Sequence, residues 1–349
     1  MKKCHKSVVV IGGGFSGAYV AKKLEGHFNV TLIDTKDYFE FTPGVLRTIV
    51  SPHHARKIQV LHEQYLRRAK FIRGHVYRTD HTHVYVGKDR IRYDYLVIAS
   101  GWRYGLPFKQ HNIVAAQRGR TLRNSHTEVE KAVRILIIGG GTVGVELAAE
   151  LITKYPKKDI VIVHSRDSLM QRSCEPVKHH AEKWLRKRGV EIHLNERVLE
   201  THRKTFQTNK GKHIRADLAF LCTGIIPNAE FLKKSFPDAV DKKCLLVDEY
   251  LRLQGSHHIF VGGDITNIPE EKLAQNAERH AQIIVDNICR DHMGKPLCAY
   301  KTKQRPMIIS LGKWHGMFTY KRTCFHGLLP AVLKSFVEWR TMKRYKRQA

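Results

Sequence analysis

The stretch ILIIGGGTVGVELAAE at residues 135–150 decides the fold, because the chain has already used its pattern in VVVIGGGFSGAYVAKKLE at residues 8–25. Each copy joins an apolar, β-branched run to a G-x-G-x-x-G turn and then to an apolar helical pattern. This order predicts a buried parallel strand, a tight turn and a helix, the unit that binds dinucleotides. A duplicated scaffold with one inactive site is the alternative, and two bound dinucleotides is the interpretation we favour.

The glycines of each turn have separate tasks. The first allows the tight bend, the second lets the backbone approach a pyrophosphate, and the third lets the helix pack on the strand. The amides at the helix N-terminus then hold the phosphates. The glycines concerned are Gly12, Gly14 and Gly17 in the first turn, and Gly139, Gly141 and Gly144 in the second.

The next strand of each unit should end beside the adenosine ribose of its dinucleotide. In the first unit the strand NVTLID ends at Asp34, whose carboxylate would accept hydrogen bonds from ribose hydroxyls and repel a 2′-phosphate. In the second unit the corresponding position falls on His164, with Arg166 two residues later. The first unit therefore suits FAD or NAD, and the second is expected to accept NADH or NADPH. The alternative is that both basic side chains are merely solvated.

Composition places the chain among globular proteins. Its 349 residues are 42% hydrophobic and allow two or three domains. Sixty-one Lys and Arg against 32 Asp and Glu give a net charge of +29, which attracts nucleic acid, acidic lipid and nucleotide phosphate alike. The basic residues are spread along the chain and form no recognised nucleic-acid-binding motif.

The seven cysteines are scattered and never form C-x-x-C, which predicts a reducing compartment, no disulfide framework and no metal site. The N-terminus MKKCHKSVVVIGGG enters the first strand directly, so we expect neither a signal peptide nor a myristoylation signal. No apolar run has the length of a membrane span. A cytoplasmic protein is expected.

Strand and helix patterns alternate along the chain, which predicts a doubly wound α/β fold. YLVIASG (95–101) would return to the first sheet, and DLAFLCTG (217–224) would close the second. SHHIFVGGD (256–264) and a long helix from about Lys272 to Cys289 would then complete the first sheet. We therefore predict two Rossmann-like domains, with the NAD(P)H domain inserted in the FAD domain. The predicted bounds are 1–105 and 225–300 for the FAD domain, 106–224 for the NAD(P)H domain, and 301–349 for a C-terminal segment.

Together these landmarks resemble the flavoproteins that bind two dinucleotides. Within that class the sequence is similar to the apoptosis-inducing-factor-like and type II NADH dehydrogenase group, and to the ferroptosis-suppressor-like NAD(P)H:quinone oxidoreductases. The likeness covers nearly the whole chain and is carried by VVVIGGGFSG, IDTKDYF, GVLRTIV, VIASG, IGGGTVGVELAAEL, VIVHS, CTGIIPN, FVGGDI and LKSFVEWRTMK. It implies hydride transfer from NADH or NADPH to FAD, and then electron transfer to a quinone or another small diffusible acceptor.

The resemblance also implies cofactor-binding residues. Asp264 is the most specific, because an acid directly after an apolar strand and two glycines seldom serves only solvation. It would contact the ribityl chain. Arg47 could instead be an ordinary surface cation, and Val76 could simply be core. The full implied set is Gly12, Gly13, Gly14, Phe15, Ser16, Gly17, Asp34, Arg47, Val76, Ala99, Gly101 and Asp264, with Gly139, Gly141, Gly144, His164 and Gly224 in the second unit.

Glu146 resembles the glutamate that this group places between nicotinamide and flavin, and it is the predicted catalytic residue. Its other interpretation is favourable charge near a helix N-terminus. The group's quinone-side pattern A-Q-x-A-x-Q is met only in part by AQNAER, where Arg279 replaces the last glutamine. No two cysteines lie within five residues of each other, as disulfide reductases of the class require. Electrons should therefore leave the flavin directly.

The C-terminal segment predicts a helix with one apolar face, formed by Leu329, Val332, Phe336, Trp339 and Met342. Its cations are Lys334, Arg340, Lys343, Arg344, Lys346 and Arg347, against the single acid Glu338. An apolar stripe with flanking cations suits the surface of an anionic bilayer, so peripheral membrane contact is expected. The alternative is that the stripe packs on the FAD domain. The net charge also leaves open a nucleic-acid-associated redox flavoprotein with non-specific binding. The oligomeric state is not predicted.

Overall fold

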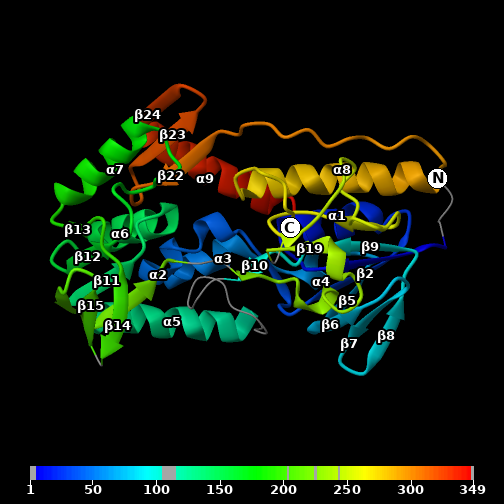
Figure 1. Cartoon of the computed structure of the whole chain (residues 1–349), viewed down its shortest axis with the longest axis horizontal. Helices are drawn as coiled ribbons and strands as arrows, with labels where there is room; N and C mark the ends of the chain where they lie inside the picture. The colour runs from blue at the N-terminus through cyan, green and yellow to red at the C-terminus, as the bar shows by residue number, and fades with distance from the viewer. Residues whose placement is uncertain (1–4, 104–114, 203, 224–225, 243, 347–349) are drawn as a thin grey trace.

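The computed structural model describes residues 5–103, 115–202, 204–223, 226–242 and 244–346. Two parallel sheets organise the chain, and each holds one glycine-rich turn (Figure 1). In the first sheet the strand order is β21 (Ile259–Val261), β9 (Tyr95–Ile98), β1 (Ser7–Ile11), β2 (Asn29–Asp34) and β5 (Lys70–Arg73). Helix α1 (Phe15–Leu24) follows β1, covers one face of this sheet and packs on α8 (Ala274–His292).

The second sheet has the order β13 (Glu191–His193), β12 (Asp159–Val163), β11 (Arg134–Ile138) and β17 (Leu218–Leu221). Its helices are α5 (Ala115–Lys131), α6 (Thr142–Lys154) and α7 (Glu175–Arg186). All four strands lie between β9 and β21 in the chain, although β9 and β21 pair directly with each other. The predicted insertion of one Rossmann-like domain into another is thereby confirmed. We call them the second and the first domain.

The two connections between the domains run side by side. The outgoing strand β10 (Trp102–Arg103) pairs antiparallel with the returning strand β18 (Ile226–Pro227). Just beyond them, the side-chain amide of Asn228 donates to the Ser100 carbonyl at 2.9 Å, and the Ser100 hydroxyl donates to the Asn228 carbonyl at 2.8 Å. The predicted boundaries at 105/106 and 224/225 fall outside the described residues, so those exact limits stay predictions.

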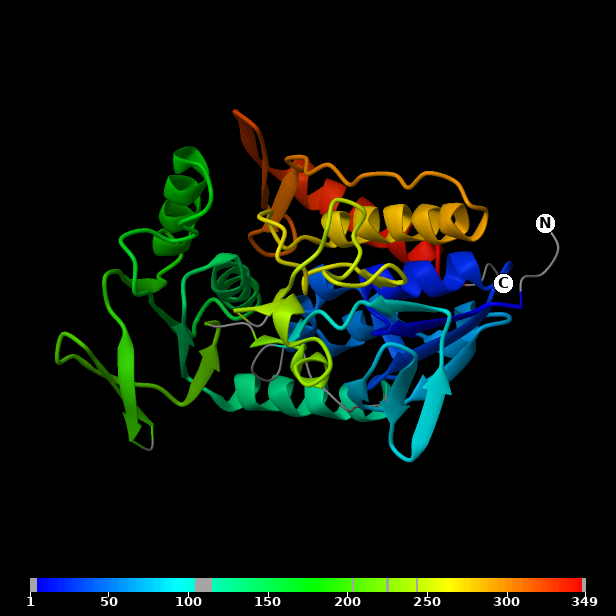
Figure 2. The same cartoon turned by 45° about the vertical axis from the view of Figure 1, so that its right-hand side comes forward.

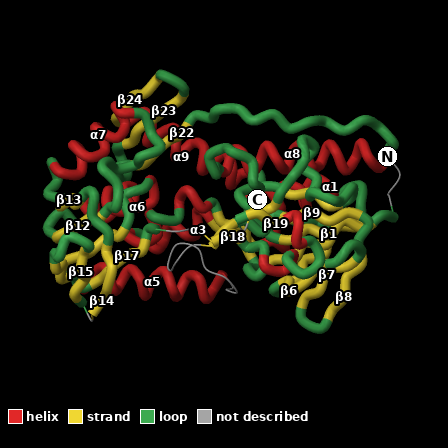
Figure 3. Tube along the Cα trace, in the orientation of Figure 1, coloured by secondary structure: helices red, strands yellow, loops and turns green. Residues whose placement is uncertain are grey.

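Smaller elements surround the two sheets. The antiparallel strands are β3 (Tyr38–Glu40), β4 (Gln59–Leu61), β6 (Val76–Thr79), β7 (His83–Val86), β8 (Asp89–Arg92), β14 (Val198–His202), β15 (Thr205–Thr208), β16 (His213–Arg215), β19 (Val240–Asp241) and β20 (Cys244–Leu245). The short helices are η1 (Thr42–Gly44), α2 (Arg47–Val50), η2 (Pro52–His54), α3 (Ala55–Ile58), α4 (His62–Tyr65), η3 (Glu230–Leu232) and η4 (Pro237–Ala239). Helix α5 runs along the side of the molecule opposite α8 and α9 (Figure 3).

The C-terminal segment bridges the domains. From the end of α8 the chain runs back along that helix (Figures 1 and 2). It then forms the C-terminal sheet, made of β22 (Met307–Ser310), β23 (Gly316–Tyr320) and β24 (Thr323–Gly327), on which α9 (Leu328–Lys343) packs. Beyond α9 the Tyr345 ring is buried in the first domain, 4.4 Å from the Phe39 ring and 5.0 Å from the Tyr65 ring between centroids. Within the described ranges, every helix is too short or too polar to cross a bilayer.

Candidate active site

The turn between β1 and α1 forms a cradle that only glycine permits. Gly12 has φ +98°, and a Cβ there would lie 2.4 Å from the carbonyl oxygen of Ala99. A Cβ at Gly17 would lie 1.8 Å from the Gly12 carbonyl oxygen, so α1 approaches the strand as closely as backbone allows. A Cβ at Gly14 would meet nothing within 4 Å. The outer side of the turn is therefore open at the N-terminus of α1, where amides are available for phosphate.

The turn between β11 and α6 repeats this cradle. Gly139 has φ +114°, and a Cβ there would lie 2.8 Å from the Cys222 carbonyl oxygen. A Cβ at Gly144 would lie 1.9 Å from the Gly139 carbonyl oxygen, whereas one at Gly141 would meet nothing within 4 Å. The two turns thus share their closed inner side and their open outer side. This matching geometry is the strongest structural sign of two dinucleotide sites.

Asp34 closes the first cradle as a buried anion. Its Oδ2 accepts a hydrogen bond from the Gly13 amide at 2.7 Å, and its Oδ1 accepts one from the Lys36 amide at 3.1 Å. Burial opposes ionisation, but the adjacent His62 ring and the charge of Lys36 hold the pKa of Asp34 well below its usual range. The fully buried His62 lies with its Nε2 3.7 Å from Asp34 Oδ2 and with its Nδ1 2.6 Å from the Tyr65 hydroxyl.

His164 occupies the matching place in the second cradle, because β12 pairs with β11 in the register that joins β2 to β1. The ring is half-buried, and a Cβ at Gly140 would lie 3.0 Å from its Cγ. Burial and the charge of Arg166 lower the pKa of His164, so a neutral imidazole stands where Asp34 stands in the first cradle. Its contact with a nucleotide stays a prediction.

The segment after β21 packs on the first cradle. A Cβ at Gly262 would lie 2.6 Å from Ser16 Oγ, so this backbone touches the start of α1. The Gly263 amide donates to His280 Nδ1 at 3.0 Å. The proton of His280 is therefore on Nε2, which lies 2.9 Å from Glu270 Oε1. Sequence patterns gave no sign of His62, His280 or Glu270, since their partners lie in other elements.

Asp264 follows directly and is half-buried. Its carbonyl oxygen accepts a hydrogen bond from the indole N–H of Trp102, in the outgoing connection β10. Burial lowers the pKa of Lys272, but Asp264 acts in the opposite sense and helps to keep that ammonium charged. The aspartate thus stands at the seam between the domains, and its contact with a bound flavin stays a prediction.

Buried polar atoms without a partner test whether dinucleotides fit. Among the described residues, ten buried side-chain polar atoms have no hydrogen-bond partner, and three of them adjoin the cradles: Ser16 Oγ, His62 Nε2 and His164 Nε2. Two of these atoms adjoin the first cradle and one adjoins the second. Because an unsatisfied buried polar group costs about 1–3 kcal/mol, such atoms mark places where a ligand group is expected. The residues present therefore fit the predicted cofactors.

The other predicted cofactor residues lie in different surroundings. Arg47 points across to α6, where its guanidinium binds Glu150 Oε1 at 2.9 Å, so it already joins the two domains. Val76 is a core residue with 6% exposure. The Gly101 carbonyl accepts a hydrogen bond from the Asn228 amide at 3.0 Å. Gly224 lies outside the described residues.

Glu146 is buried on α6, and one oxygen of its carboxylate already accepts two hydrogen bonds. Its Oε1 accepts a hydrogen bond from the Ser310 amide in β22 at 2.7 Å and another from Lys334 Nζ in α9 at 2.6 Å. The predicted catalytic carboxylate is therefore joined to the C-terminal segment by a half-buried ion pair. By sequence, Lys334 is only one of the tail cations, because 188 positions separate it from its partner Glu146.

A cleft of about 1260 Å³ opens beside this ion pair, between α2, α6, α9 and the turn before β23. Its lining includes Arg47, Glu150, Trp314, Trp339, Met342 and Lys343. A much smaller pocket adjoins it, which shares Arg47 and Glu150 and also contacts Glu146 and Lys334. The small pocket, which shares part of its lining with the cleft, contacts the predicted catalytic carboxylate.

Comparison with known protein families decides the identity of the fold. Residues 6–281, which contain both cradles, match the pyridine nucleotide-disulphide oxidoreductase family. The chain belongs to this family. Its cofactors are FAD and NADH or NADPH.

Relatives of similar length share the whole chain. It is 30% identical to apoptosis-inducing factor homolog B of Dictyostelium discoideum, over 95% of this chain and 94% of that protein. It is 31% identical to ferroptosis suppressor protein 1 of Taeniopygia guttata, over 96% and 95%. Its fold matches NDH2 from Plasmodium falciparum, solved in complex with NADH, with a TM-score of 0.82 at 15% identity over 99% of each chain.

The family is named for a disulphide, and this chain carries no such pair among its described residues, whose six cysteines are all unpaired. Cys222, which follows β17 beside the second cradle, is held protonated because burial raises its pKa to about 12. Burial also raises the pKa values of Cys244 and Cys289. Thiols in such surroundings are poor nucleophiles.

Proposed function

We propose that the chain is an NAD(P)H:quinone oxidoreductase that holds FAD in the first cradle and NADH or NADPH in the second. The observation that carries this proposal is the pair of matching cradles on two sheets joined by adjacent connections. FAD, when bound, supplies the redox chemistry by accepting a hydride and passing electrons onward. The chain supplies the binding and the orientation of the cofactors.

The residues then have distinct tasks. Amides at the N-termini of α1 and α6 bind the two pyrophosphates. Asp34 accepts hydrogen bonds from the ribose hydroxyls of FAD, and Asp264 holds the ribityl side of the same cofactor. Glu146, fixed by Lys334, sits between the domains and orients the nicotinamide against the flavin. We propose this catalytic role for Glu146 because its carboxylate is buried, charged and anchored from a third segment of the chain.

The acceptor is best placed in the cleft beside Glu146. Pockets for small molecules commonly measure about 300–1,000 Å³, and this cleft of about 1260 Å³ has room for a ring with a tail. The Trp314 and Trp339 rings offer apolar surface at its mouth, and they are 65% and 56% exposed.

Helix α9 is proposed to dock on an anionic membrane surface. Leu329, Val332, Phe336 and Trp339 are 51–59% exposed, so the stripe is not packed on the first domain. Met342 is the exception, because it is 3% exposed and belongs to the core. An exposed apolar helical face that includes a tryptophan suits the interface of a bilayer.

The charge available to lipid is smaller than the sequence suggested. Lys334 pairs with Glu146, and Arg344 binds Glu278 at 2.9 Å. Lys346 donates to two backbone carbonyls in α3. Arg340 and Lys343 remain exposed on the helix, at about 1 kcal/mol of attraction each near an anionic leaflet. The apolar stripe must therefore contribute most of the binding.

The decisive test of the enzyme is anaerobic reduction. We expect purified protein to be yellow with about one FAD per chain, to be bleached by NADH without added thiol, and to regain colour with a quinone. Gly14→Val and Gly141→Val are matched variants, because both side chains would point into the open side of a cradle. The first should lose FAD, and the second should keep FAD but resist bleaching. A folded, colourless protein that cannot be reconstituted would refute the proposal.

Flotation with liposomes tests the docking of α9. Full-length protein should float with vesicles containing acidic lipid, and the triple variant Val332→Glu, Phe336→Glu and Trp339→Glu should not. Leu199→Glu is the control, because it changes an apolar side chain that is 61% exposed in the second domain. Equal flotation of both variants would show that α9 is not the docking surface. Binding to DNA instead, lost at physiological salt, would indicate the nucleic-acid alternative.

A further inference from the structure

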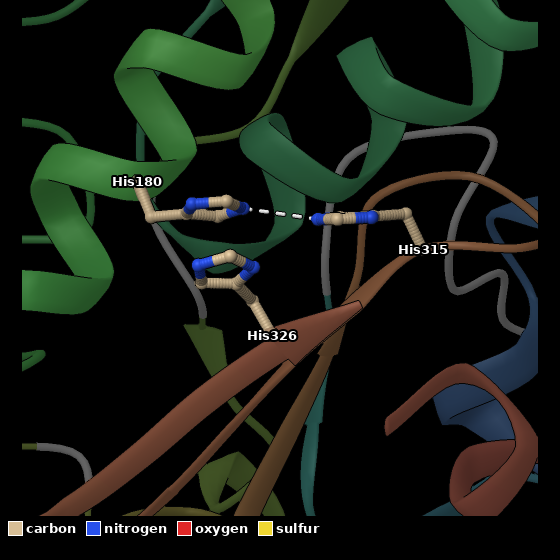
Figure 4. A group of neighbouring side chains, drawn as sticks. All are labelled: His180, His315 and His326. Atoms are coloured by element: carbon tan, nitrogen blue, oxygen red, sulfur yellow. Dashed lines mark hydrogen bonds between the residues drawn. The ribbon is translucent and has the colours of Figure 1, made fainter. Parts of the chain in front are cut away.

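Three histidines that are far apart in the sequence meet where α7 faces the C-terminal sheet (Figure 4). His180 lies on α7, His315 lies just before β23, and His326 lies on β24. One ring nitrogen from each residue lies within 4.8 Å of the other two. We call them the histidine cluster. Neither cradle uses these side chains, and they do not line the cleft beside Glu146.

The spacing of the rings is close to that of metal ligands. The Nε2 atoms of His180 and His315 point at each other and are 3.0 Å apart (Figure 4). Two nitrogens that bind one tetrahedral Zn²⁺ at about 2.0–2.1 Å are themselves about 3.3 Å apart. The His326 ring stacks on His180 with 3.6 Å between centroids. His326 is exposed, and one of its ring nitrogens lies within 4.8 Å of a ring nitrogen of each of the other two residues.

Burial and nearby charge disfavour protonation of the His180 and His315 rings. Burial, with His326 and His315 nearby, lowers the pKa of His180 to about 4. Burial, His326 and Arg188 lower the pKa of His315. Neutral imidazole is the ligand form of histidine. The facing nitrogens of His180 and His315 repel one another unless a proton or a cation lies between them.

We propose that the histidine cluster binds one divalent metal ion of the class that prefers imidazole nitrogen, with Zn²⁺ as the representative. Three protein ligands leave a fourth position for water. No carboxylate belongs to the cluster, so it does not suit Ca²⁺ or Mg²⁺, which require oxygen ligands. The positive charges of Lys183 and Arg188 nearby oppose any cation, so the coordinate bonds from imidazole must outweigh this repulsion.

The location gives the ion a structural task. His180 belongs to the second domain, whereas His315 and His326 belong to the C-terminal sheet. That sheet carries Ser310, one of the two partners of Glu146, and is continuous with α9. A bound ion therefore ties α7 to the segment that anchors the predicted catalytic carboxylate. Because it binds the folded chain, it must also raise the temperature of unfolding.

The test uses tag-free, full-length protein with FAD bound. Zn²⁺ binding is measured by competition with a chromogenic chelator, and Co²⁺ serves as a second probe through its visible absorbance in a tetrahedral site. We expect about one ion per chain and a higher melting temperature with Zn²⁺. Loss even of an outer partner of a ligand costs about 10–100-fold in metal affinity, so His180→Gln, His315→Gln and His326→Gln should each cost at least that much.

Two controls separate the site from other metal-binding groups. His179→Gln changes the neighbouring, exposed histidine of α7 and should bind Zn²⁺ as the wild type does. The double variant Cys174→Ser, Cys324→Ser tests the nearest thiols and should also bind normally. His326→Gln is the variant least able to disturb folding, because its ring is exposed. Equal Zn²⁺ affinity of wild type and His326→Gln, or loss of binding only in the cysteine variant, would overturn the proposal. Absence of tight binding in the wild type would do the same.

Discussion

The two cradles have the same backbone and different ends. In the first, the ionised Asp34 is buried, bound by two amides and backed by His62. In the second, the neutral, half-buried His164 stands at the equivalent position, and Leu169 packs against Gly140. The buried, ionised Asp34 suits a cofactor that stays bound. The half-buried, neutral His164 suits a coenzyme that binds and dissociates in each turnover. The same fold therefore supplies a prosthetic site and a substrate site.

The largest expected effect tests whether the two turns are equally intolerant of a side chain at their first glycine. Gly12→Ala and Gly139→Ala should each lower the free energy of unfolding by about 2–5 kcal/mol, because positive φ costs roughly 1–2 kcal/mol and overpacking adds about 1–3 kcal/mol. Gly14→Ala and Gly141→Ala are the matched controls and should leave stability nearly unchanged. Chemical denaturation of the four variants measures this. Similar losses of stability in all four variants would mean that the turns have no open space at Gly14 and Gly141.

A smaller effect separates the ends of the cradles. Asp34→Asn should weaken FAD retention by about 1.5–3 kcal/mol, as expected for a lost charged hydrogen bond, and should leave the KM for NADH unchanged. The pKa of Asp34 is lowered on folding, so its contribution to stability is present above the unfolded value and lost as pH falls below about 4. The variant should therefore show a flatter acid limb of stability. If the variant and the wild type lose stability at low pH in the same way, an ionised Asp34 is not what distinguishes the first cradle from the second.

The smallest effect concerns the choice of coenzyme. Since no carboxylate replaces His164, NADPH should reduce the flavin within about tenfold of the NADH rate, a difference under about 1.4 kcal/mol. His164→Glu should shift the preference toward NADH, and His193→Gln, at the end of the neighbouring β13, should not. Stopped-flow flavin reduction gives both rates. A wild-type preference above a thousandfold would show that another residue reads the 2′ position.

Sequence patterns predicted what depends on neighbours along the chain. The two strand–turn–helix units, the positions of Asp34 and His164 and the insertion of one domain in the other all follow from short motifs and their order. Helical periodicity also identified the residues that share a face of α9, but it could not say that Met342 turns inward while Trp339 stays exposed. Which part of a face is covered depends on its partner.

Sequence patterns could not predict contacts between segments that are distant in the chain. Arg47 reads as a flavin ligand by resemblance, yet it binds Glu150 across the seam between the domains. Lys334 looked like a lipid-facing cation and is the partner of Glu146. The scattered cysteines led us to expect no metal site, and the histidine cluster joins positions that only the fold brings together. Each of these depends on how the C-terminal segment closes over both domains.

The Lys334–Glu146 pair gives α9 a second property, that of an energetic coupler. Docking of α9 on lipid could move Lys334. If it does, the docking changes the affinity for the nucleotide that we propose to bind beside Glu146. Coupling between two binding equilibria is reciprocal, so the nucleotide must change the affinity for lipid by the same factor. Vesicle partition measured with and without NADH gives this factor directly. A value above one would mean that the coenzyme itself recruits the protein to the membrane.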